Sequence, residues 1–320
     1  MTDHLRLYEI MATIRAADDK LASIVMSGQA MLMLYSPRGH EAIAAGVTHD
    51  LTPDDYVVTT YRGLHDHIAK GVPLPELFAE ILGRATGTCK GKGGSMHITH
   101  PASGLMVTTG IVGGGLPVAN GLALASALRG DGRVTVCSFG DGASNIGAFH
   151  EALNLASLWS LPVVFVCQNN GYAEHTAYAK GTAVERIADR APAYRMRGVT
   201  IDGRDPVAVQ EAASEAIAAA RSGLGPTLLE ALTWRLGGHY VGADFSYMAA
   251  EEMEAARAAD PVPAYRARLL AEGRLSEEDL AAADKRAGDA VEVAMEFALA
   301  SPFADPDEIL VDVYAAGAPG

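Results

Sequence analysis

The stretch that decides the fold runs from residue 133 to residue 172 and reads RVTVCSFGDGASNIGAFHEALNLASLWSLPVVFVCQNNGY. Two apolar segments, RVTVCSF and LPVVFVCQ, have the composition of buried strands, and SNIGAFHEALNLASLW between them has the spacing of a helix. A strand, a helix and a second strand in this order predict a right-handed unit with two parallel strands. Both strands of such a unit end at the same edge of the sheet.

Polar side chains follow both predicted strands. Asp141 lies in the glycine turn GDG after the first strand, and Asn169 and Asn170 follow the second strand, with residues 143–168 between. If the strands are neighbours, about 5 Å separates them, and a carboxylate, an amide oxygen and nearby carbonyls converge. Such an all-oxygen set suits Mg²⁺ or Ca²⁺ better than zinc.

The same edge of the sheet also has features that favour an anion. A helix predicted to begin near Ser144 points its free N–H groups there, and the glycine turn, which we expect to be exposed, allows close approach. Metal, helix terminus and glycine turn together predict a diphosphate site. Taken singly, GDG and NNG are also common turn sequences. Nucleotide binding is the weaker alternative, because neither the Walker A spacing nor GxGxxG after a strand is found.

The rest of the chain extends this pattern. Further strands are predicted in YVVTT, GVTIDG and PTLLEALTWRL, and apolar residues recur at helical spacing over 4–34 and in GGGLPVANGLALASALRG. Nearly all-apolar strands alternating with helices predict an α/β fold with a mostly parallel sheet and helices on both faces. No linker divides the sequence, so we expect a single domain over residues 1–320, with a helical C-terminal region from about residue 250.

Composition excludes several classes of partner. The net charge of −14 argues against nucleic-acid and membrane-surface binding. No apolar run approaches the ~18 residues that a membrane span needs. A cytoplasmic enzyme is expected.

Across nearly its whole length the sequence resembles one family. GDG followed by NN at this spacing is similar to thiamine diphosphate enzymes. YRG, GKGGSMH, GIVGGG, FGDGASN, DRAPAY and SPFADPDEILVDVY occur in the order typical of the α subunits of 2-oxo acid and acetoin dehydrogenase complexes, and NNGYAEHT and GHYVGAD resemble the acetoin type. The resemblance implies the thiamine diphosphate-binding fold and the cofactors thiamine diphosphate and Mg²⁺. It also implies a β subunit in an α₂β₂ assembly and a lipoyl-bearing acyltransferase as partner.

The resemblance also implies roles for individual residues. It assigns Mg²⁺ ligation to the side chains of Asp141 and Asn170 and to the backbone carbonyl of Tyr172. It assigns cofactor contacts to eight residues, which are Tyr61 and Arg62 at the diphosphate, the amides of Gly142 and Ala143 near it, the backbone of Gly110 and Val112 at the aminopyrimidine ring, and Asn170 and His239. His239 is the expected catalytic residue, which moves protons at the bound cofactor. His97 is assigned either a loop-anchoring or a catalytic role.

The implied reaction is oxidation of a carbonyl substrate. The enzyme would cleave acetoin or decarboxylate a 2-oxo acid and pass the acyl unit to lipoate. The glutamate that activates the cofactor belongs to the β subunit in this family, and no candidate for it is found in this chain. The chain is therefore expected to hold half of an active site.

The sequence departs from the family at a few positions. Leu64 replaces a histidine near the diphosphate, His40 replaces a glutamine, and Gly237 replaces a second histidine. Tyr240 stands where animal pyruvate enzymes have a regulatory serine, which argues against phosphorylation control there. The Leu64 change motivates an alternative from another enzyme class, a thiamine diphosphate-dependent lyase or ligase α subunit that forms acyloins without a lipoyl acceptor.

Overall fold

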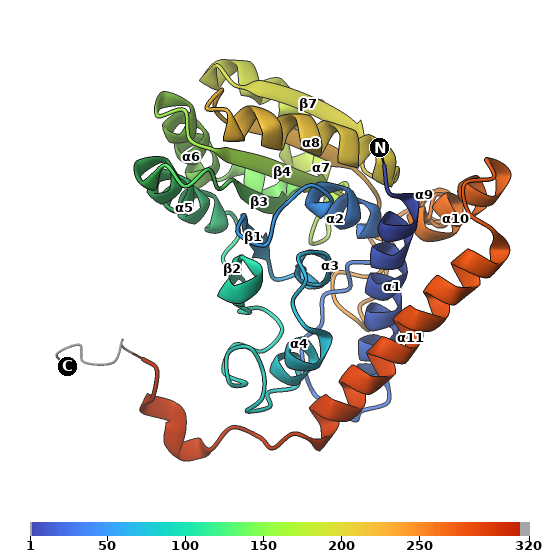
Figure 1. The fold of residues 1–320 in the computed structure, drawn as a ribbon. Coiled ribbons are helices and arrows are strands. Elements are labelled where there is room, and N and C mark those ends of the chain that lie inside the picture. Colours follow the sequence, from blue (N-terminus) through green and yellow to red (C-terminus); the bar gives the residue numbers. More distant parts are fainter. Residues whose placement is uncertain (1, 314–320) are drawn as a thin grey trace.

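The structure is a computed structural model that describes residues 2–313. Met1 and residues 314–320, which include the final tyrosine of the motif SPFADPDEILVDVY, lie outside the described residues. A six-stranded sheet forms the centre of the described chain, in the order β2-β1-β3-β4-β8-β7 (Figure 1). The bounds of its strands are Tyr56–Thr60 for β1, Leu105–Thr109 for β2, Thr135–Gly140 for β3, Val163–Asn169 for β4, Arg197–Asp202 for β7 and Thr227–Leu232 for β8.

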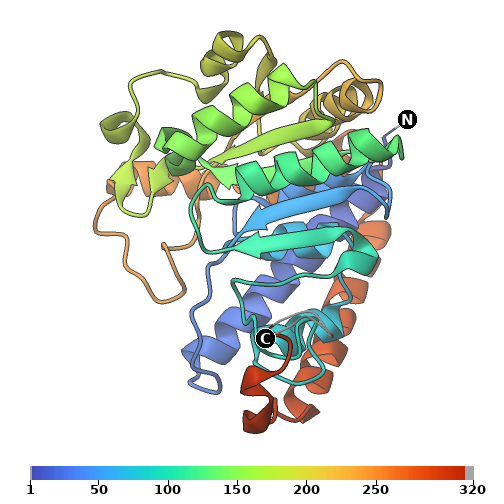
Figure 2. The same ribbon diagram turned by 90° about the vertical axis from the view of Figure 1, so that its left-hand side faces the viewer.

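Every pair of neighbouring strands in this sheet is parallel, which confirms the predicted fold class. The two strands of the opening stretch, β3 and β4, are direct neighbours, paired from Thr135–Val163 to Gly140–Gln168. The polar residues that follow these strands therefore lie at one edge of the sheet. Figure 2 shows the arrowheads of β1 and β2 pointing toward the same side of the molecule.

Helices cover both faces of the sheet, and a short antiparallel ribbon follows β4. The helices are α1 (His4–Met26), α2 (Glu41–Thr48), α3 (Leu64–Ala69), α4 (Leu74–Ile81), α5 (Gly115–Arg129), α6 (Gly147–Leu158), α7 (Tyr178–Gly181), α8 (Pro206–Arg221), α9 (Ala250–Ala258), α10 (Pro261–Ala271) and α11 (Glu277–Ala300). The ribbon pairs β5 (Tyr172–Ala173) with β6 (Thr176–Ala177). Within the described residues, no helix has the length and apolar character that would let it cross a membrane.

The two faces of the sheet explain why its central strands are apolar at every position. Val136 of β3 belongs to the core that packs against α8, α2 and α4, whereas the next residue, Cys137, belongs to the core that packs against α5 and α6. Because successive side chains of a strand point to opposite faces, a strand covered on both sides needs apolar residues throughout. A third core joins α1, α10 and α11.

One strand was missed, and two local expectations were wrong. The strand β2 was not predicted, because its five residues stand between glycine-rich segments. The helix expected to begin near Ser144 begins at Gly147. A 3₁₀ turn over Asp141–Asn145 precedes it, and the extended backbone of Ile146 separates the two. The first helix ends at Met26 instead of continuing to residue 34, since Gly28 leaves helical geometry with φ of +76°.

Candidate active site

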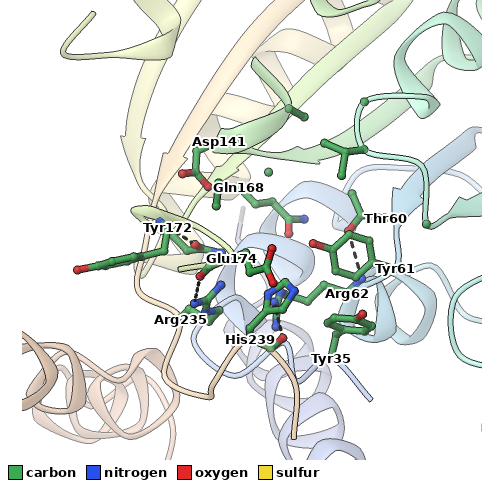
Figure 3. A pocket seen from close by; sticks show the side chains of 18 of the residues that line it. Tyr35, Thr60, Tyr61, Arg62, Asp141, Gln168, Tyr172, Glu174, Arg235 and His239 are labelled. Carbon is green, nitrogen blue, oxygen red and sulfur yellow. Dashed lines mark hydrogen bonds between the residues drawn. The ribbon is translucent and has the colours of Figure 1, made fainter. Parts of the chain in front are cut away.

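A cavity of about 430 Å³ lies at the carboxyl ends of the parallel strands. Its walls come from the segments that follow β1, β2, β3, β4 and β8, together with Tyr35 and His40 ahead of α2 (Figure 3). The structure brings together in this cavity all the residues to which the resemblance assigns metal, cofactor or catalytic contacts, apart from His97, and these are Tyr61, Arg62, Gly110, Val112, Asp141, Gly142, Ala143, Asn170, Tyr172 and His239.

Asp141 places a carboxylate in the wall of the cavity where no described side chain neutralises it. Its side chain is 2 % exposed, which corrects the expectation of an exposed turn, and its Oδ2 atom has no hydrogen-bond partner within residues 2–313. Burial raises the pKa of this carboxyl group to about 6. A buried carboxylate oxygen without a partner is costly, and a bound cation is one way to compensate it.

The turn that carries Asp141 is packed closely enough to require glycine. A Cβ atom added at Gly142 would stand 2.6 Å from the Cβ atom of Ala173, so the turn touches the ribbon after β4. One added at Gly140 would meet no atom of the described chain within 4 Å. The backbone of the turn therefore borders open space on one side, and a bulky anion has room to approach it.

Asn170 and Tyr172 form the wall beside Asp141. The amide oxygen of Asn170 accepts a hydrogen bond from the backbone N–H of Tyr172 at 3.2 Å, and its Nδ2 atom lies 3.1 Å from Nε2 of His40. The phenol of Tyr172 donates to Glu252 at 2.8 Å, and Figure 3 shows its ring directed away from Asp141. Both residues line the cavity.

This oxygen set fits a hard divalent cation. Asp141, Asn170 and a carbonyl of Tyr172 would be oxygen ligands, as Mg²⁺ prefers. No group of three or more His, Cys, Asp or Glu residues suited to a metal ion is found in the described part of the chain. A cation at this edge would therefore depend on amide and carbonyl oxygens in addition to one carboxylate.

Arg62 joins three parts of the cavity. Its guanidinium donates to the carbonyl of Ser36 at 2.7 Å and to the carbonyl of His239 at 2.9 Å. Burial and the nearby charge of Arg235 lower the pKa of Arg62 to about 10, which leaves it cationic at neutral pH. Beside it, the ring of Tyr61 meets that of Tyr35 edge to face with centroids 4.5 Å apart.

His239 is a half-buried imidazole held neutral by its surroundings. Burial, followed by the charges of Arg62 and Arg235, lowers its pKa to about 4. Its ring stands edge to face with Tyr35 at 5.3 Å, and its Nδ1 atom contacts no hydrogen-bond partner in the described chain. This nitrogen is buried as well as unpartnered, and the residue lines the cavity.

Sequence reasoning missed a second arginine of the cavity. Arg235 is 2 % exposed, donates to the carbonyl of Glu174 and to the hydroxyl of Tyr247, both at 2.6 Å, and has an Nε atom without a partner among residues 2–313. Its position soon after β8 was a usable signal, because that strand ends at the same sheet edge. Gln168 also lines the cavity, and its place at the carboxyl end of β4 was the same kind of signal, whereas nothing in the local sequence of Tyr35 and Glu174 indicated that they do.

Other singled-out residues lie elsewhere. Leu64 is part of an apolar core, and His65 and His67 are buried beneath the cavity with Gln168 and Thr108 as partners. His97 is exposed, with its ring beside Gly110. Tyr240 is exposed next to His239.

Comparison with known proteins gives a consistent result. The profile of the family described as "Dehydrogenase E1 component" matches residues 8–307. The chain is 44 % identical over 312 residues to the α subunit of acetoin:2,6-dichlorophenolindophenol oxidoreductase of Bacillus subtilis, covering 97 % of this chain and 93 % of that protein. The corresponding subunit of Cupriavidus necator is 42 % identical with the same coverage. The α-3 subunit of the chloroplastic pyruvate dehydrogenase E1 component of Oryza sativa is 38 % identical, over 97 % of this chain and 75 % of that protein.

Proposed function

Because the chain belongs to the dehydrogenase E1 component family, we propose that it is the α subunit of an acetoin dehydrogenase that passes the acyl unit to lipoate. The family makes it a thiamine diphosphate-dependent oxidoreductase subunit that works with a β subunit. We propose, in addition, the identity of the donor, of the metal and of the acceptor, and the roles of the individual site residues.

Acetoin is proposed as the donor because the acetoin-oxidising relatives have higher sequence identity to this chain than the pyruvate dehydrogenase subunit has. Two acetoin-oxidising relatives are 44 % and 42 % identical to the chain, against 38 % for a pyruvate dehydrogenase subunit, and each match covers 97 % of this chain. The glycine-rich segment around His239 supports the same choice, since Gly237 stands where the pyruvate type has a histidine.

We assign the cofactor to the cavity described above. Thiamine diphosphate, when bound, supplies a carbanion that adds to a carbonyl and then accepts electrons. Asp141, Asn170 and the carbonyl of Tyr172 would hold Mg²⁺, and the unpartnered Oδ2 atom of Asp141 supports this. Tyr61, Arg62 and the amides of Gly142 and Ala143 would face the diphosphate, and the backbone of Gly110 and Val112 would face the aminopyrimidine ring.

We assign to His239 the movement of the substrate proton. A pKa near 4 means that the imidazole is neutral at pH 7 and has a lone pair available. Cleavage of the bond between the carbonyl and hydroxyl-bearing carbons of acetoin releases acetaldehyde and requires that the hydroxyl group lose its proton, and a neutral imidazole beside it can accept that proton. The remaining two-carbon fragment reaches the acyl level only when lipoate or the dye accepts two electrons from it. Arg62 fixes the backbone of His239 through its carbonyl, which limits where the ring can stand.

Co-expression with the β subunit tests the donor. We expect the complex to reduce 2,6-dichlorophenolindophenol faster with acetoin than with pyruvate or branched-chain 2-oxo acids. A kcat/KM for any 2-oxo acid above that for acetoin would contradict the assignment.

The acceptor separates the proposal from the alternative of an acyloin-forming lyase or ligase. That alternative was motivated by Leu64, which packs in the apolar core and is not among the residues that line the cavity. Incubation of the α/β complex with a lipoylated acyltransferase domain and acetoin should acetylate the lipoyl group, as measured by mass spectrometry. Dye reduction without acetylation would favour the alternative.

His239→Ala should spare cofactor binding, because the metal and diphosphate residues are separate. It should lower acetylation of the lipoyl domain by roughly 10²–10⁴-fold, the usual contribution of general acid–base groups. If guiding lipoate is its main role, reduction of the dye should fall less. Equal, small losses in both assays would remove His239 from the mechanism.

A further inference from the structure

His40 occupies an unusual place beneath the cavity. It is the residue directly before α2, has no exposed surface, and lines the cavity next to Asn170. Its two ring nitrogens have one partner each. Nδ1 lies 3.1 Å from the carbonyl oxygen of Pro37, and Nε2 lies 3.1 Å from Nδ2 of Asn170.

Three hydrogen bonds link Pro37, His40, Asn170 and Tyr172 in a row, and the groups at the two ends of the row determine the direction of each bond. The carbonyl of Pro37 can only accept, so the Nδ1 atom of His40 donates to it and carries the proton of the neutral ring. The Nε2 atom must then accept, and the Nδ2 group of Asn170 donates to it. At the other end the backbone N–H of Tyr172 can only donate, so the atom of Asn170 that it contacts is the amide oxygen.

These contacts decide which end of the Asn170 amide faces a cation. Rotation of the amide by 180° would place its oxygen against the lone pair of His40 and its NH₂ group against the N–H of Tyr172, and both contacts would be lost. The amide oxygen keeps one lone pair free in the observed orientation. We infer that His40 is a positioning residue that fixes the Asn170 amide so that its oxygen faces the cation site.

The surrounding backbone holds His40 in place. Gly39 has φ of +99°, and a Cβ atom there would collide with the carbonyl oxygen of Trp234. The N–H of Gly39 donates to the carboxylate of Glu41 at 2.8 Å, and its carbonyl accepts from the hydroxyl of Thr233. The segment before α2 is thus fastened to the residues that follow β8, and the imidazole has little freedom to move.

The inference rests on the proposed metal site of Asp141 and Asn170, and its test separates the two. The measurement is binding of thiamine diphosphate to the cofactor-free α/β complex by calorimetry at several Mg²⁺ concentrations. His40→Leu fills similar space but accepts no hydrogen bond, so the amide can turn. We expect the Mg²⁺ requirement for binding to rise roughly 10-fold or more, as for other residues that orient metal ligands.

Two further variants report on the mechanism of the loss. His40→Gln offers a carbonyl oxygen that can accept from Asn170, and the Mg²⁺ requirement should rise less than in His40→Leu. Asn170→Asp in the His40→Leu background replaces the amide by a carboxylate, which presents an oxygen whichever way it turns. Recovery of most of the lost Mg²⁺ affinity in this double variant would support orientation over simple packing.

The results that would contradict the role of His40 differ from those that would contradict the metal site. Binding by His40→Leu at the wild-type Mg²⁺ concentration, while Asp141→Ala loses Mg²⁺-dependent binding, would refute the role of His40 and leave the site intact. Loss in His40→Leu without recovery in the double variant would reduce His40 to a packing residue. Normal binding by Asp141→Ala would overturn the site itself. Thermal unfolding without cofactor shows which variants are folded, and His40→Gln against wild type remains informative if His40→Leu is not.

Discussion

Asp141 is under opposite demands from the fold and from the proposed metal. Its buried Oδ2 atom has no partner in residues 2–313, and burial raises its pKa to about 6, so the carboxylate is unfavourable for the cofactor-free protein. Asp141→Asn removes the charge at nearly constant volume. We expect a melting temperature without cofactor equal to or above that of the wild type, and no further rise when thiamine diphosphate and Mg²⁺ are added. A cofactor-dependent rise of wild-type size would contradict the metal assignment.

His239 gives a pH-dependent signal of its own. Because burial and two arginines lower its pKa from 6.5 to about 4, the folded state binds this proton less tightly than the unfolded state. The linked stability is present above about pH 6.5 and is lost as the pH falls toward 4. In NMR of the full chain, the His239 ring signal, assigned by its loss in His239→Gln, should stay constant from pH 8 to 5. Arg62→Gln should move its midpoint upward, and a wild-type midpoint near 6.5 would be inconsistent with this picture.

Individual residues differ in how far sequence alone could place them. Asp141 and Asn170 were predictable because each directly follows a strand, and parallel strands bring such residues to one edge. Tyr35 and Glu174 were not, since Tyr35 lies in a segment without regular structure and Glu174 in the turn of the short ribbon after β4, which was not predicted. The partner of His40 was equally hidden, because 130 residues separate it from Asn170.

At the scale of elements, strands with strong apolar runs were predicted well, and elements bounded by glycine were not. The five residues of β2 offer too short a pattern, and the start of α6 is set by the 3₁₀ turn ahead of it. Helical spacing also continued past the true end of α1, because periodicity does not report the backbone angle of Gly28. Glycine positions therefore deserve direct tests.

Two glycines flanking and within α5 should respond in opposite ways to the same change. Gly113 has φ of +71° and would bring a Cβ atom into the side chain of Ile146, so Gly113→Ala should destabilise the chain by more than about 1 kcal/mol. Gly121, with ordinary helical φ and open space around it, is the matched control, and Gly121→Ala should stabilise by about 0.5–1 kcal/mol. Urea unfolding of the full chain measures both. Equal effects would show that the strain at Gly113 is absent.

At the scale of the whole molecule, we propose that residues 1–320 form one thiamine diphosphate-binding domain, including the helical region from about residue 250. Side chains of α11 share one core with α1 and α10, and others join the main core under the sheet. Thermal unfolding should therefore show one transition by both circular dichroism and tyrosine fluorescence. Separate melting of the C-terminal helices would argue for two units.

Assembly with the β subunit is expected to use α5. Its outer face, formed by Val118, Gly121, Ala125 and Leu128, follows helical spacing, and Leu128 is 80 % exposed, while the opposite face packs on the sheet. One face of this helix is therefore used for packing within the chain, and the other is exposed and available to a partner. We expect Val118→Asp to break an α₂β₂ assembly in light scattering and to abolish turnover. Leu224, which is more exposed and lies far along the chain, provides the control variant Leu224→Asp. An intact assembly in Val118→Asp, or turnover by a β-free chain, would count against this.

The two carbonyls bound by Arg62 affect how a mutation of this residue should be interpreted. One guanidinium ties the loop of Ser36 to the loop of His239, so a missense allele at this codon would disturb both loops in addition to removing the proposed contact with an anion. An activity screen would attribute the loss of activity in such an allele to catalysis alone, and an argument from sequence conservation would reach the same conclusion. Inhibitor design faces the same point from the other side, because a ligand that competes for this cation would loosen both loops at once.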